Sequence, residues 1–180
     1  MAIRPIVRLG HPSLRQTAQL VDPALLADPE LQTLIDDMIE TMKDADGVGL
    51  AAPQVGVELQ LFVYLASPDG EDPAARVLIN PTLVPEHGEM VEDWEGCLSI
   101  PDLRGLVPRH AALRVHGLDR HGKPVDERVE GFEARVLQHE LDHLNGIVFL
   151  DRMRDLRSLA FTDEWADFLA EDEEEDGPAG

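Results

Sequence analysis

Residues 132–146 read FEARVLQHELDHLNG, a stretch that predicts a single helix over 132–145. Its leucines recur at the three- and four-residue spacing of one helix face, at Leu137, Leu141 and Leu144. Gly146 follows at the position where a helix commonly ends. We therefore expect a helix that is fixed against a core along its leucine face.

This helix carries the pattern His-Glu-x-x-His. His139 and His143 are four residues apart, so their imidazoles lie about one turn apart on one face and can reach the same metal ion. Glu140 then stands beside the ion, where it can take the proton of an attacking water. So short a pattern also arises by chance, and the alternative is a charged helix face in solvent. The buried leucine face favours the metal site.

Two histidines are an incomplete site, because catalytic zinc-type centres usually have three protein ligands and one open position. No histidine follows His143. Upstream, Cys97 is the only cysteine of the chain, and Gly96 before it allows close approach of the backbone. A lone cysteine is often only a small buried apolar residue. A thiolate with two imidazoles would nevertheless complete a tetrahedral site with one free position.

A second helix is expected from Pro29 to Lys43. Asp28 is placed to cap it, and Pro29 suits the first helical position. The residues that form its apolar face are Leu31, Leu34, Ile35, Met38, Ile39 and Met42. This pattern predicts an amphipathic helix that packs on the core near the amino terminus.

Short runs rich in β-forming residues lie between the two helices. Turn signals such as Pro-Asp-Gly and His-Gly separate them, and short connections favour antiparallel pairing. The expected strands are Leu61–Leu65, Val77–Ile79, Met90–Trp94, Leu113–Leu118 and Val125–Val129. Helices at the ends with strands between them predict an α+β fold.

Composition limits the class of protein. The chain has 180 residues, of which 43% are hydrophobic, and this fits one globular domain. No apolar run approaches the roughly 18 residues of a membrane span, and no signal-peptide pattern opens the sequence. A single cysteine fits a reducing compartment. We expect a cytoplasmic protein without a membrane partner.

The net charge of −21 is unevenly distributed. Such a field repels phosphate backbones, so we expect no DNA partner. We expect one domain over residues 1–160 and an acidic tail over 161–180. In that tail Thr162 is predicted to cap a short helix that carries Trp165, Phe168 and Leu169 on one face. The run 171–176 is predicted to be disordered because its charges repel one another.

Three motifs in order carry a resemblance. They are GVGLAAPQ at residues 47–54, EGCLS at 95–99 and QHELDH at 138–143. Over Ile3–Asp151 the chain resembles the peptide deformylases, metal-dependent hydrolases that remove the formyl group from the formylmethionine of newly made proteins. The resemblance implies antiparallel sheets packed around a central helix that carries the two histidines, and formylmethionyl peptides as substrates.

The resemblance also implies roles for single residues. Cys97, His139 and His143 would be the metal ligands, and Glu140 the general base and acid. Gln54, through its side-chain amide, and Leu98, through its backbone N–H, would donate to the formyl oxygen. Such donors are typical of an oxyanion hole.

Substrate binding is expected along backbone near Val48, Gly49 and Gly96, by addition of the peptide as a strand. Candidates for an apolar methionine pocket are Phe132 and Val136, together with Val48 and Leu98. Phe132 and Val136 could equally belong to the core. The resemblance further implies an ion pair between Glu95 and Arg104 that braces the cysteine loop. Arg135 has no assigned place.

The cofactor implied by the resemblance is one divalent ion, ferrous iron in the cell, with zinc, nickel or cobalt able to replace it. Some relatives dock on the ribosome through a basic terminal helix. The acidic end of this chain argues against such docking.

Two other functions remain open from the residues alone. A zincin protease would need a third ligand downstream of His143, and a binding protein with structural zinc would need a fourth ligand. The motifs supply neither.

Overall fold

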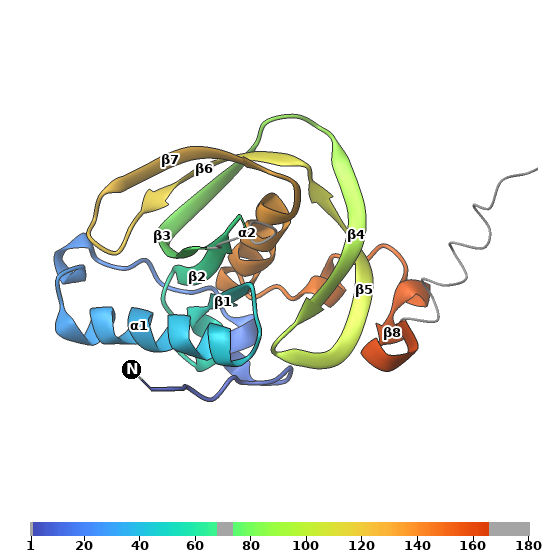
Figure 1. The fold of residues 1–180 in the computed structure, drawn as a ribbon, viewed down its shortest axis with the longest axis horizontal. Helices are drawn as coiled ribbons and strands as arrows, with labels where there is room; N and C mark the ends of the chain where they lie inside the picture. Colours follow the sequence, from blue (N-terminus) through green and yellow to red (C-terminus); the bar gives the residue numbers. More distant parts are fainter. Residues whose placement is uncertain (1, 68–73, 166–180) are drawn as a thin grey trace, which may run out of the picture.

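The computed structural model describes residues 2–67 and 74–165 (Figure 1). Its α-helices in these ranges are α1, Pro29–Asp44, and α2, Gly131–Leu144. The strands are β1 Gly49–Ala51, β2 Leu61–Ala66, β3 Ala74–Pro85, β4 Met90–Cys97, β5 Ile100–His110, β6 Ala112–Leu118, β7 Pro124–Glu130 and β8 Ala160–Phe161. Short 3₁₀ helices lie at Pro12–Arg15, Pro23–Leu25, Ala52–Val55, Phe149–Asp151 and Leu156–Ser158. No helix in the described ranges has the length and apolar composition that a membrane crossing requires.

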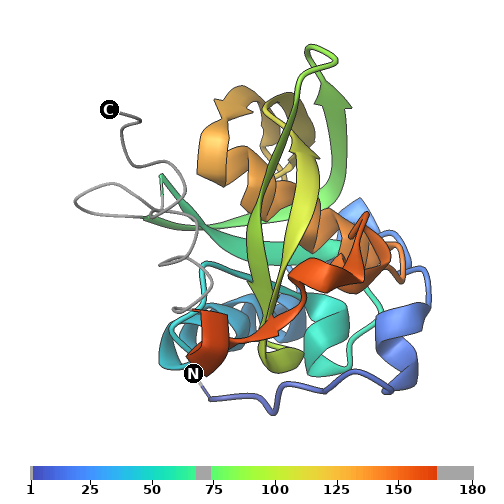
Figure 2. The ribbon, with the colours of Figure 1, turned by 90° about the vertical axis from the view of Figure 1, so that its right-hand side faces the viewer.

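The strands form two antiparallel sheets. One has the order β1-β2-β3-β6-β7 and the other the order β4-β5-β8, and all neighbouring strands in both run antiparallel. Figure 2 shows the β4–β5 hairpin standing across the first sheet. The mixed composition and the antiparallel pairing that the sequence predicts are confirmed.

The strand β2 is buried on both of its faces. Successive side chains of a strand point to opposite faces. Leu61 and Val63 belong to the apolar cluster that contains α1, whereas Phe62 and Tyr64 belong to the cluster that contains α2. The two helices thus cover opposite faces of the five-stranded sheet (Figure 1). Because both faces of β2 are buried, its sequence is a continuous apolar run and does not alternate between apolar and polar residues.

Capping fixes the start of α1. The Asp28 carboxylate accepts a hydrogen bond from the backbone N–H of Glu30 at 2.7 Å, and Pro29 occupies the first helical position. The helix ends one residue later than expected, at Asp44. Its buried face includes Ile35, which is fully enclosed.

The helix α2 is tied to the second sheet as well as to the first. Its Gln138 side chain accepts from the backbone N–H of His110 at 3.0 Å and donates to the carbonyl of the same residue at 3.0 Å. The amide group of Gln138 therefore pairs with the end of β5 much as a neighbouring strand would. This contact holds α2 between the five-stranded sheet and the hairpin.

Sequence reasoning missed the strand β5. Pro101, Gly105 and Pro108 interrupt it, and prolines are usual only where a strand edge is open. β5 accommodates its two prolines because β8 pairs with it only at Leu103 and Arg104, which leaves the rest of that edge open. The expected strand Val77–Ile79 is also longer, since β3 extends to Pro85 with a register shift after Ile79.

The strand β8 crosses the boundary that we expected between residues 160 and 161, because Phe161 pairs with Leu103. Residues 162–165 then begin a helical segment, with Thr162 at its start. The expected positions of Phe168 and Leu169 and the predicted disorder of 171–176 lie outside the described residues.

We predict that Ile35→Ala lowers the free energy of unfolding by about 2–5 kcal/mol, because it leaves a cavity where α1 meets the five-stranded sheet. Denaturant unfolding followed by circular dichroism measures this change. Glu40→Ala, on the exposed side of the same helix, is the matched control and should unfold almost as the wild type does. Equal loss in both variants would contradict the packing of α1 described here.

Candidate metal centre and active site

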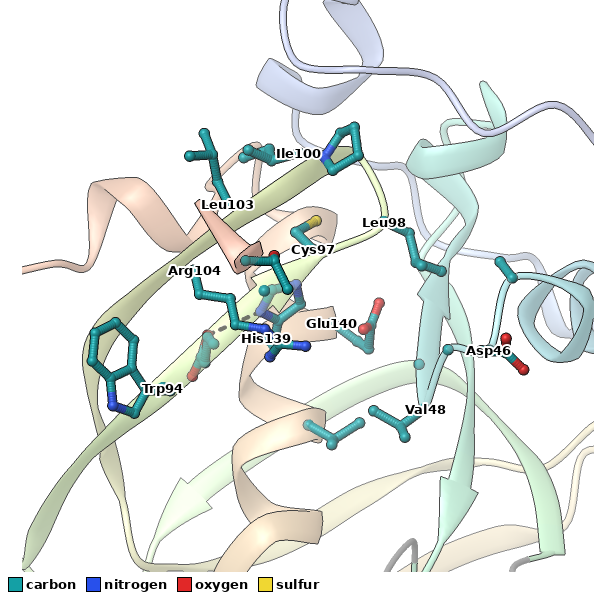
Figure 3. A pocket seen from close by; sticks show the side chains of 18 of the residues that line it. Asp46, Val48, Trp94, Cys97, Leu98, Ile100, Leu103, Arg104, His139 and Glu140 are labelled. Atoms are coloured by element: carbon teal, nitrogen blue, oxygen red, sulfur yellow. Dashed lines mark hydrogen bonds and ion pairs between the residues drawn. The ribbon is translucent and has the colours of Figure 1, made fainter. Parts of the chain in front are cut away.

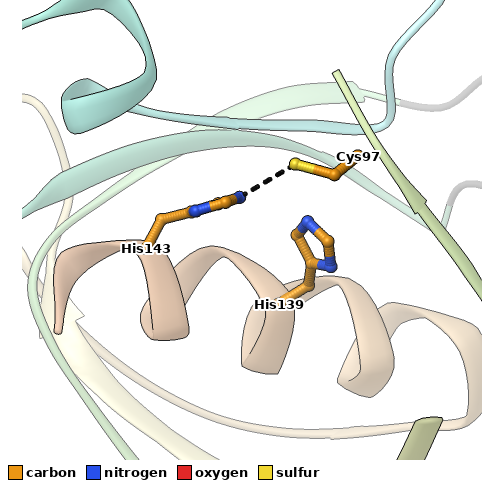
Figure 4. A group of neighbouring side chains, drawn as sticks. All are labelled: Cys97, His139 and His143. Carbon is orange, nitrogen blue, oxygen red and sulfur yellow. Dashed lines mark hydrogen bonds between the residues drawn. The ribbon is translucent and has the colours of Figure 1, made fainter. Parts of the chain in front are cut away.

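Three side chains meet where the β4–β5 hairpin faces α2. Cys97 stands at the end of β4, just before a two-residue turn at residues 98–99, and His139 and His143 come from successive turns of α2 (Figure 4). One ligand atom from each lies within 4.8 Å of the others. The Cys97 sulfur is 3.3 Å from Nε2 of His143. A thiolate and two imidazoles are the donor set that first-row divalent ions accept, so these residues fit such an ion.

The orientation of the His139 ring is fixed by Glu95, on the side away from the other two ligands. Its Nδ1 is 2.9 Å from Oε2 of Glu95, which leaves Nε2 directed at Cys97 and His143. Burial alone would lower the pKa of His139, but the neighbouring Cys97 and Glu95 raise it well above its ordinary value. A carboxylate behind a ligating histidine is a common device that fixes the ring and increases its basicity.

The Glu95 carboxylate is buried and accepts four hydrogen bonds. Oε1 accepts from Nε of Arg109 and from Nη1 of Arg135, both at 2.8 Å. Oε2 accepts from Nη2 of Arg109 at 3.0 Å and lies against His139. Burial would raise the pKa of Glu95, but the bonds from Arg109 and His139 outweigh it and hold the pKa far below the ordinary value. Glu95 is therefore an anion with all its acceptor positions used.

The expected ion pair between Glu95 and Arg104 is wrong. Within the described residues the arginines that pair with Glu95 are Arg109 and Arg135. In the hairpin Glu95 faces Gly105 and points to the buried side, whereas Arg104 faces Gly96 and points to the opposite side. A strand alternates its faces, so Arg104 cannot reach the carboxylate.

The ion network continues along α2. Nη1 of Arg109 donates to Oδ2 of Asp142 at 2.6 Å, and Arg152 reaches Oδ1 of the same carboxylate at 2.6 Å. Arg135, whose place the sequence left open, also donates to the carbonyls of Val107 and Val91, both at 2.8 Å. It thereby joins β4, β5 and α2. Of this network, the sequence predicted the bracing role of Glu95 but neither of its arginine partners, and Asp142 stood out only as part of the QHELDH motif.

Glu140 lies beside the ligands and faces β1. Its Oε2 is buried and has no hydrogen-bond partner in the described part of the chain. Its side chain fills the space next to Gly49: a Cβ added there would lie 2.8 Å from the Glu140 Cδ. Burial raises the pKa of Glu140 to about 7, and the Ala51 amide opposes this only in part. Any larger residue in place of Gly49, in the first motif, would thus have to displace the Glu140 carboxyl group.

Gln54 is held so that its NH₂ group faces the thiol. Its Oε1 accepts from the backbone N–H of Ala51 at 2.7 Å, which fixes the amide. Its Nε2 is then 3.6 Å from the Cys97 sulfur and 3.3 Å from Oγ of Ser99. Gln54 is almost fully buried, and it comes from the 3₁₀ helix that follows β1. An uncharged donor is therefore aimed at the position beside the ligands.

A cavity of about 480 Å³ opens onto these groups (Figure 3). The sequence-predicted residues that line it are Val48, Gly49, Gln54, Glu95, Gly96, Cys97, Leu98, Arg104, Phe132, Val136, His139 and Glu140. His143 is fully buried behind them and does not line the cavity. Val136 is enclosed, whereas Phe132 is 39% exposed at the opening. Arg135, Trp94 and Thr162 also line the cavity. The sequence already suggested Trp94 for the rim of the pocket and left Arg135 unplaced, and it gave Thr162 no role there.

A thiolate, two imidazoles, a buried carboxyl and an oriented amide around one cavity are the parts of a metal-dependent hydrolase. The polypeptide deformylase family model matches residues 3–158. Peptide deformylase 1 of Nitrosomonas europaea is 49% identical over 166 residues, which cover 89% of this chain and 93% of the relative. Peptide deformylase 2 of Ralstonia nicotianae is 46% identical over the same shares of the two chains.

Solved structures agree. A ligand-bound class I type b peptide deformylase from Acinetobacter baumannii superposes with a TM-score of 0.81 at 37% identity, covering 85% of this chain and all of that one. A Met-Ala-Ser-bound structure of that enzyme gives a TM-score of 0.78 at 37% identity, covering 84% of this chain and 99% of that one. The chain belongs to the polypeptide deformylase family, the metal-dependent hydrolases that remove the formyl group from N-formylmethionyl peptides.

We predict that Arg109→Leu destabilises the fold by about 3–5 kcal/mol, because it leaves Glu95 and Asp142 with fewer partners while both stay buried. Denaturant unfolding measures the loss. Arg114→Leu removes an ion pair with Asp126 in which both side chains are about half exposed, and it should change stability little. If the two variants unfold alike, the buried network does not support the hairpin.

Proposed function

We propose that Cys97, His139 and His143 hold one divalent ion and that Glu140 acts as general base and acid in hydrolysis of the formyl amide. The observation that supports this most strongly is the convergence of the three ligand atoms within 4.8 Å beside a buried Glu140 oxygen that lacks a described partner. When bound, the ion supplies Lewis acidity and makes water a stronger nucleophile at neutral pH. We propose ferrous iron as the ion used in the cell; the same donors accept zinc, nickel or cobalt.

Glu140 would carry the proton through the reaction. Its carboxylate takes a proton from the attacking water as oxygen bonds to the formyl carbon. It then gives that proton to the methionine nitrogen as the C–N bond breaks, which releases formate. Its position beside Gly49 supports this role, since the carboxyl group is confined at the cavity wall. General acid–base steps of this kind contribute about 10²–10⁴-fold to a rate.

Gln54 and Leu98 would stabilise the oxyanion. The Gln54 Nε2 is directed at the cavity by the bond that its Oε1 accepts from Ala51, and Leu98 follows Cys97 in the hairpin turn. Charge develops on the formyl oxygen as water adds, and donors placed there in advance favour the transition state. Because the Gln54 amide is uncharged, it donates without competing with the ion for the thiolate.

The peptide would bind as an added strand. Val48, Gly49 and Gly96 offer backbone at the cavity wall, and main-chain pairing would accept many sequences after the first residue. Val48, Leu98, Phe132 and Val136 would enclose the methionine side chain. The binding of a Met-Ala-Ser peptide by the Acinetobacter enzyme supports a peptide that begins with methionine as the ligand here.

The proposal extends to the domain organisation and the location of the enzyme. We take α2 as the central element of a catalytic domain over residues 1–160, followed by an acidic tail over 161–180. We propose a cytoplasmic enzyme that acts on nascent chains near the ribosome without docking through its tail, since that tail carries nine acids and no base from Thr162 onward. Electrostatic repulsion from ribosomal RNA supports this view.

The test of the function is substrate choice. Wild-type protein loaded anaerobically with Fe(II) should release formate from formyl-Met-Ala and leave acetyl-Met-Ala and an internal-peptide substrate intact. The proposed mechanism expects the formyl hydrogen to fit beside the ligands and the larger methyl group of the acetyl substrate not to fit there. Formate is measured by a coupled assay and peptide cleavage by chromatography. Cleavage of the internal peptide would favour a protease instead.

A second test isolates Glu140. Glu140→Gln keeps the size of the side chain but cannot accept a proton at neutral pH, so formyl-Met-Ala turnover should fall by about 10²-fold or more. Metal content, measured on the same sample, should stay at the wild-type value because the three ligands are intact. Glu133→Gln, on the same helix but outside the cavity, is the control and should retain turnover. Bound metal together with wild-type turnover in Glu140→Gln would contradict the assignment of Glu140 as the general base.

A further inference from the structure

The segment that opens the described chain lies outside the active-site cavity. In Figure 2 it is the dark blue trace that passes the turn of the β4–β5 hairpin and the 3₁₀ helix Ala52–Val55. No described residue before Ala45 lines the cavity. Any effect of this segment on the reaction must therefore act through other residues.

Two backbone hydrogen bonds join this segment to the loops that carry the proposed oxyanion donors. The N–H of Val7 donates to the carbonyl oxygen of Gln54 at 2.9 Å. The N–H of Leu9 donates to the carbonyl oxygen of Ser99, also at 2.9 Å. Gln54 would supply one oxyanion donor through its side chain, and Ser99 directly follows Leu98, whose backbone would supply the other. One short stretch of chain thus contacts both loops from behind.

We call residues 7–9 the amino-terminal strap. The N–H groups of residues two apart on an extended chain point to the same side. Two residues of such a chain rise about 7 Å, so the strap presents two donors about that far apart along one edge. A shift of either loop along the strap would break one of the two bonds. The strap therefore sets a spacing between the loops.

Both acceptors belong to buried residues. Gln54 is 1% exposed and Ser99 is fully enclosed. A carbonyl oxygen that loses its donor inside a protein costs free energy, which resists movement of either loop away from the strap. The chain after the strap is anchored as well, since Oγ of Ser13 donates to the carbonyl of Pro53 at 2.8 Å. The strap is thus held on the same 3₁₀ helix that carries Gln54.

A direct contact between the two loops does not replace the strap. Nε2 of Gln54 is 3.3 Å from Oγ of Ser99, a longer contact than either strap bond. Nε2 is also the group that would donate to the formyl oxygen. The backbone bonds from the strap are independent of this amide, so they can keep the spacing while Nε2 serves the substrate.

We propose that Val7 and Leu9 are positioning residues for hydrolysis of the formyl amide. Their backbone N–H groups set the distance between Gln54 and the turn that contains Leu98, and so align the two oxyanion donors. This inference rests on the proposed function, to which the roles of Gln54 and Leu98 belong. The strap touches neither the substrate nor the metal ligands.

Removal of single N–H groups tests the proposal, in the full chain loaded with Fe(II). Val7→Pro and Leu9→Pro each delete one strap donor. In each variant kcat for formyl-Met-Ala should fall by about three- to thirtyfold, less than the roughly 10²–10³-fold cost of losing an oxyanion donor outright. KM should stay within about twofold of the wild-type value, because the oxyanion forms only in the transition state. Metal content, measured on the same samples, should not change.

The variant that carries both prolines separates a spacing role from two unrelated structural effects. A bridge that is cut at one end no longer sets a distance. The second proline should therefore add little, and kcat should stay within about twofold of the more affected single variant. Independent effects would instead multiply.

Control variants keep the donors. Val7→Ala and Leu9→Ala retain both N–H groups and should keep the wild-type kcat. Arg8→Pro places the same ring between the two donors, at an N–H that bonds to no described residue, and should also keep the wild-type kcat. Circular dichroism and thermal unfolding report whether each variant is folded. If a proline variant does not fold, one glycine inserted between Val7 and Arg8 takes its place, because it keeps both donors, changes their spacing and should lower kcat by the same factor.

Wild-type kcat in folded Val7→Pro or Leu9→Pro would overturn the proposal, and so would an equal fall in Arg8→Pro. Losses that multiply in the variant with both prolines would show two separate effects and no bridge. Loss of metal in step with kcat would mean that the ligands had moved, which also contradicts the proposal. Failure of the wild type to hydrolyse formyl-Met-Ala would instead overturn the proposed function.

Discussion

The Glu95 carboxylate is the interaction on which the candidate site depends. It lies on the β4–β5 hairpin two residues before Cys97, and it binds two arginines and the ring of His139 at the same time. Cys97 comes from one sheet and the histidines from α2, so something must fix the distance between these elements. A buried anion with four donors does so, because any shift of the hairpin would leave a charged group unpaired in a region of low dielectric. The ligand geometry is thus a consequence of the network behind it.

Much of this arrangement could be predicted from the sequence, and the exceptions have a physical cause. The helix α2 and its two histidines follow from residue types at fixed local spacing, which a sequence displays directly. Cys97 lies far upstream in the chain, and the resemblance to a known family is what grouped it with them. The pairing of Glu95 with Arg109 rather than Arg104 depends on which face of β5 each arginine occupies. Gly105, Val107 and Arg109 alternate onto the buried face, but a strand interrupted by two prolines shows no such alternation to a reader of the sequence.

The charges around the site are balanced, and this matters for the reaction. The two buried arginines, Arg109 and Arg135, are matched by the two buried carboxylates of Glu95 and Asp142, so the buried part of the frame adds no net charge. Arg152, which also pairs with Asp142, is about half exposed to solvent. In the proposed mechanism, the Cys97 thiolate would offset only part of the charge of a divalent ion. The remaining positive charge would act on the formyl oxygen, with Gln54 adding a donor but no charge. A charged donor at that position would instead weaken the binding of the ion.

The same balance explains how a protein with a charge of −21 can build this site. Most acids of the described residues are exposed or partly exposed, where water screens them, and a further group stands in the sequence at residues 163–176. The interior uses arginine, whose planar fork meets two carboxylate oxygens at once, and this is the geometry that Arg109 shows with Glu95. Lysine could not replace it, since a single ammonium group would satisfy fewer of the acceptors of Glu95 and Asp142. The shape of the guanidinium group, more than its charge, therefore explains why the basic side chains buried in this core are arginines and not lysines.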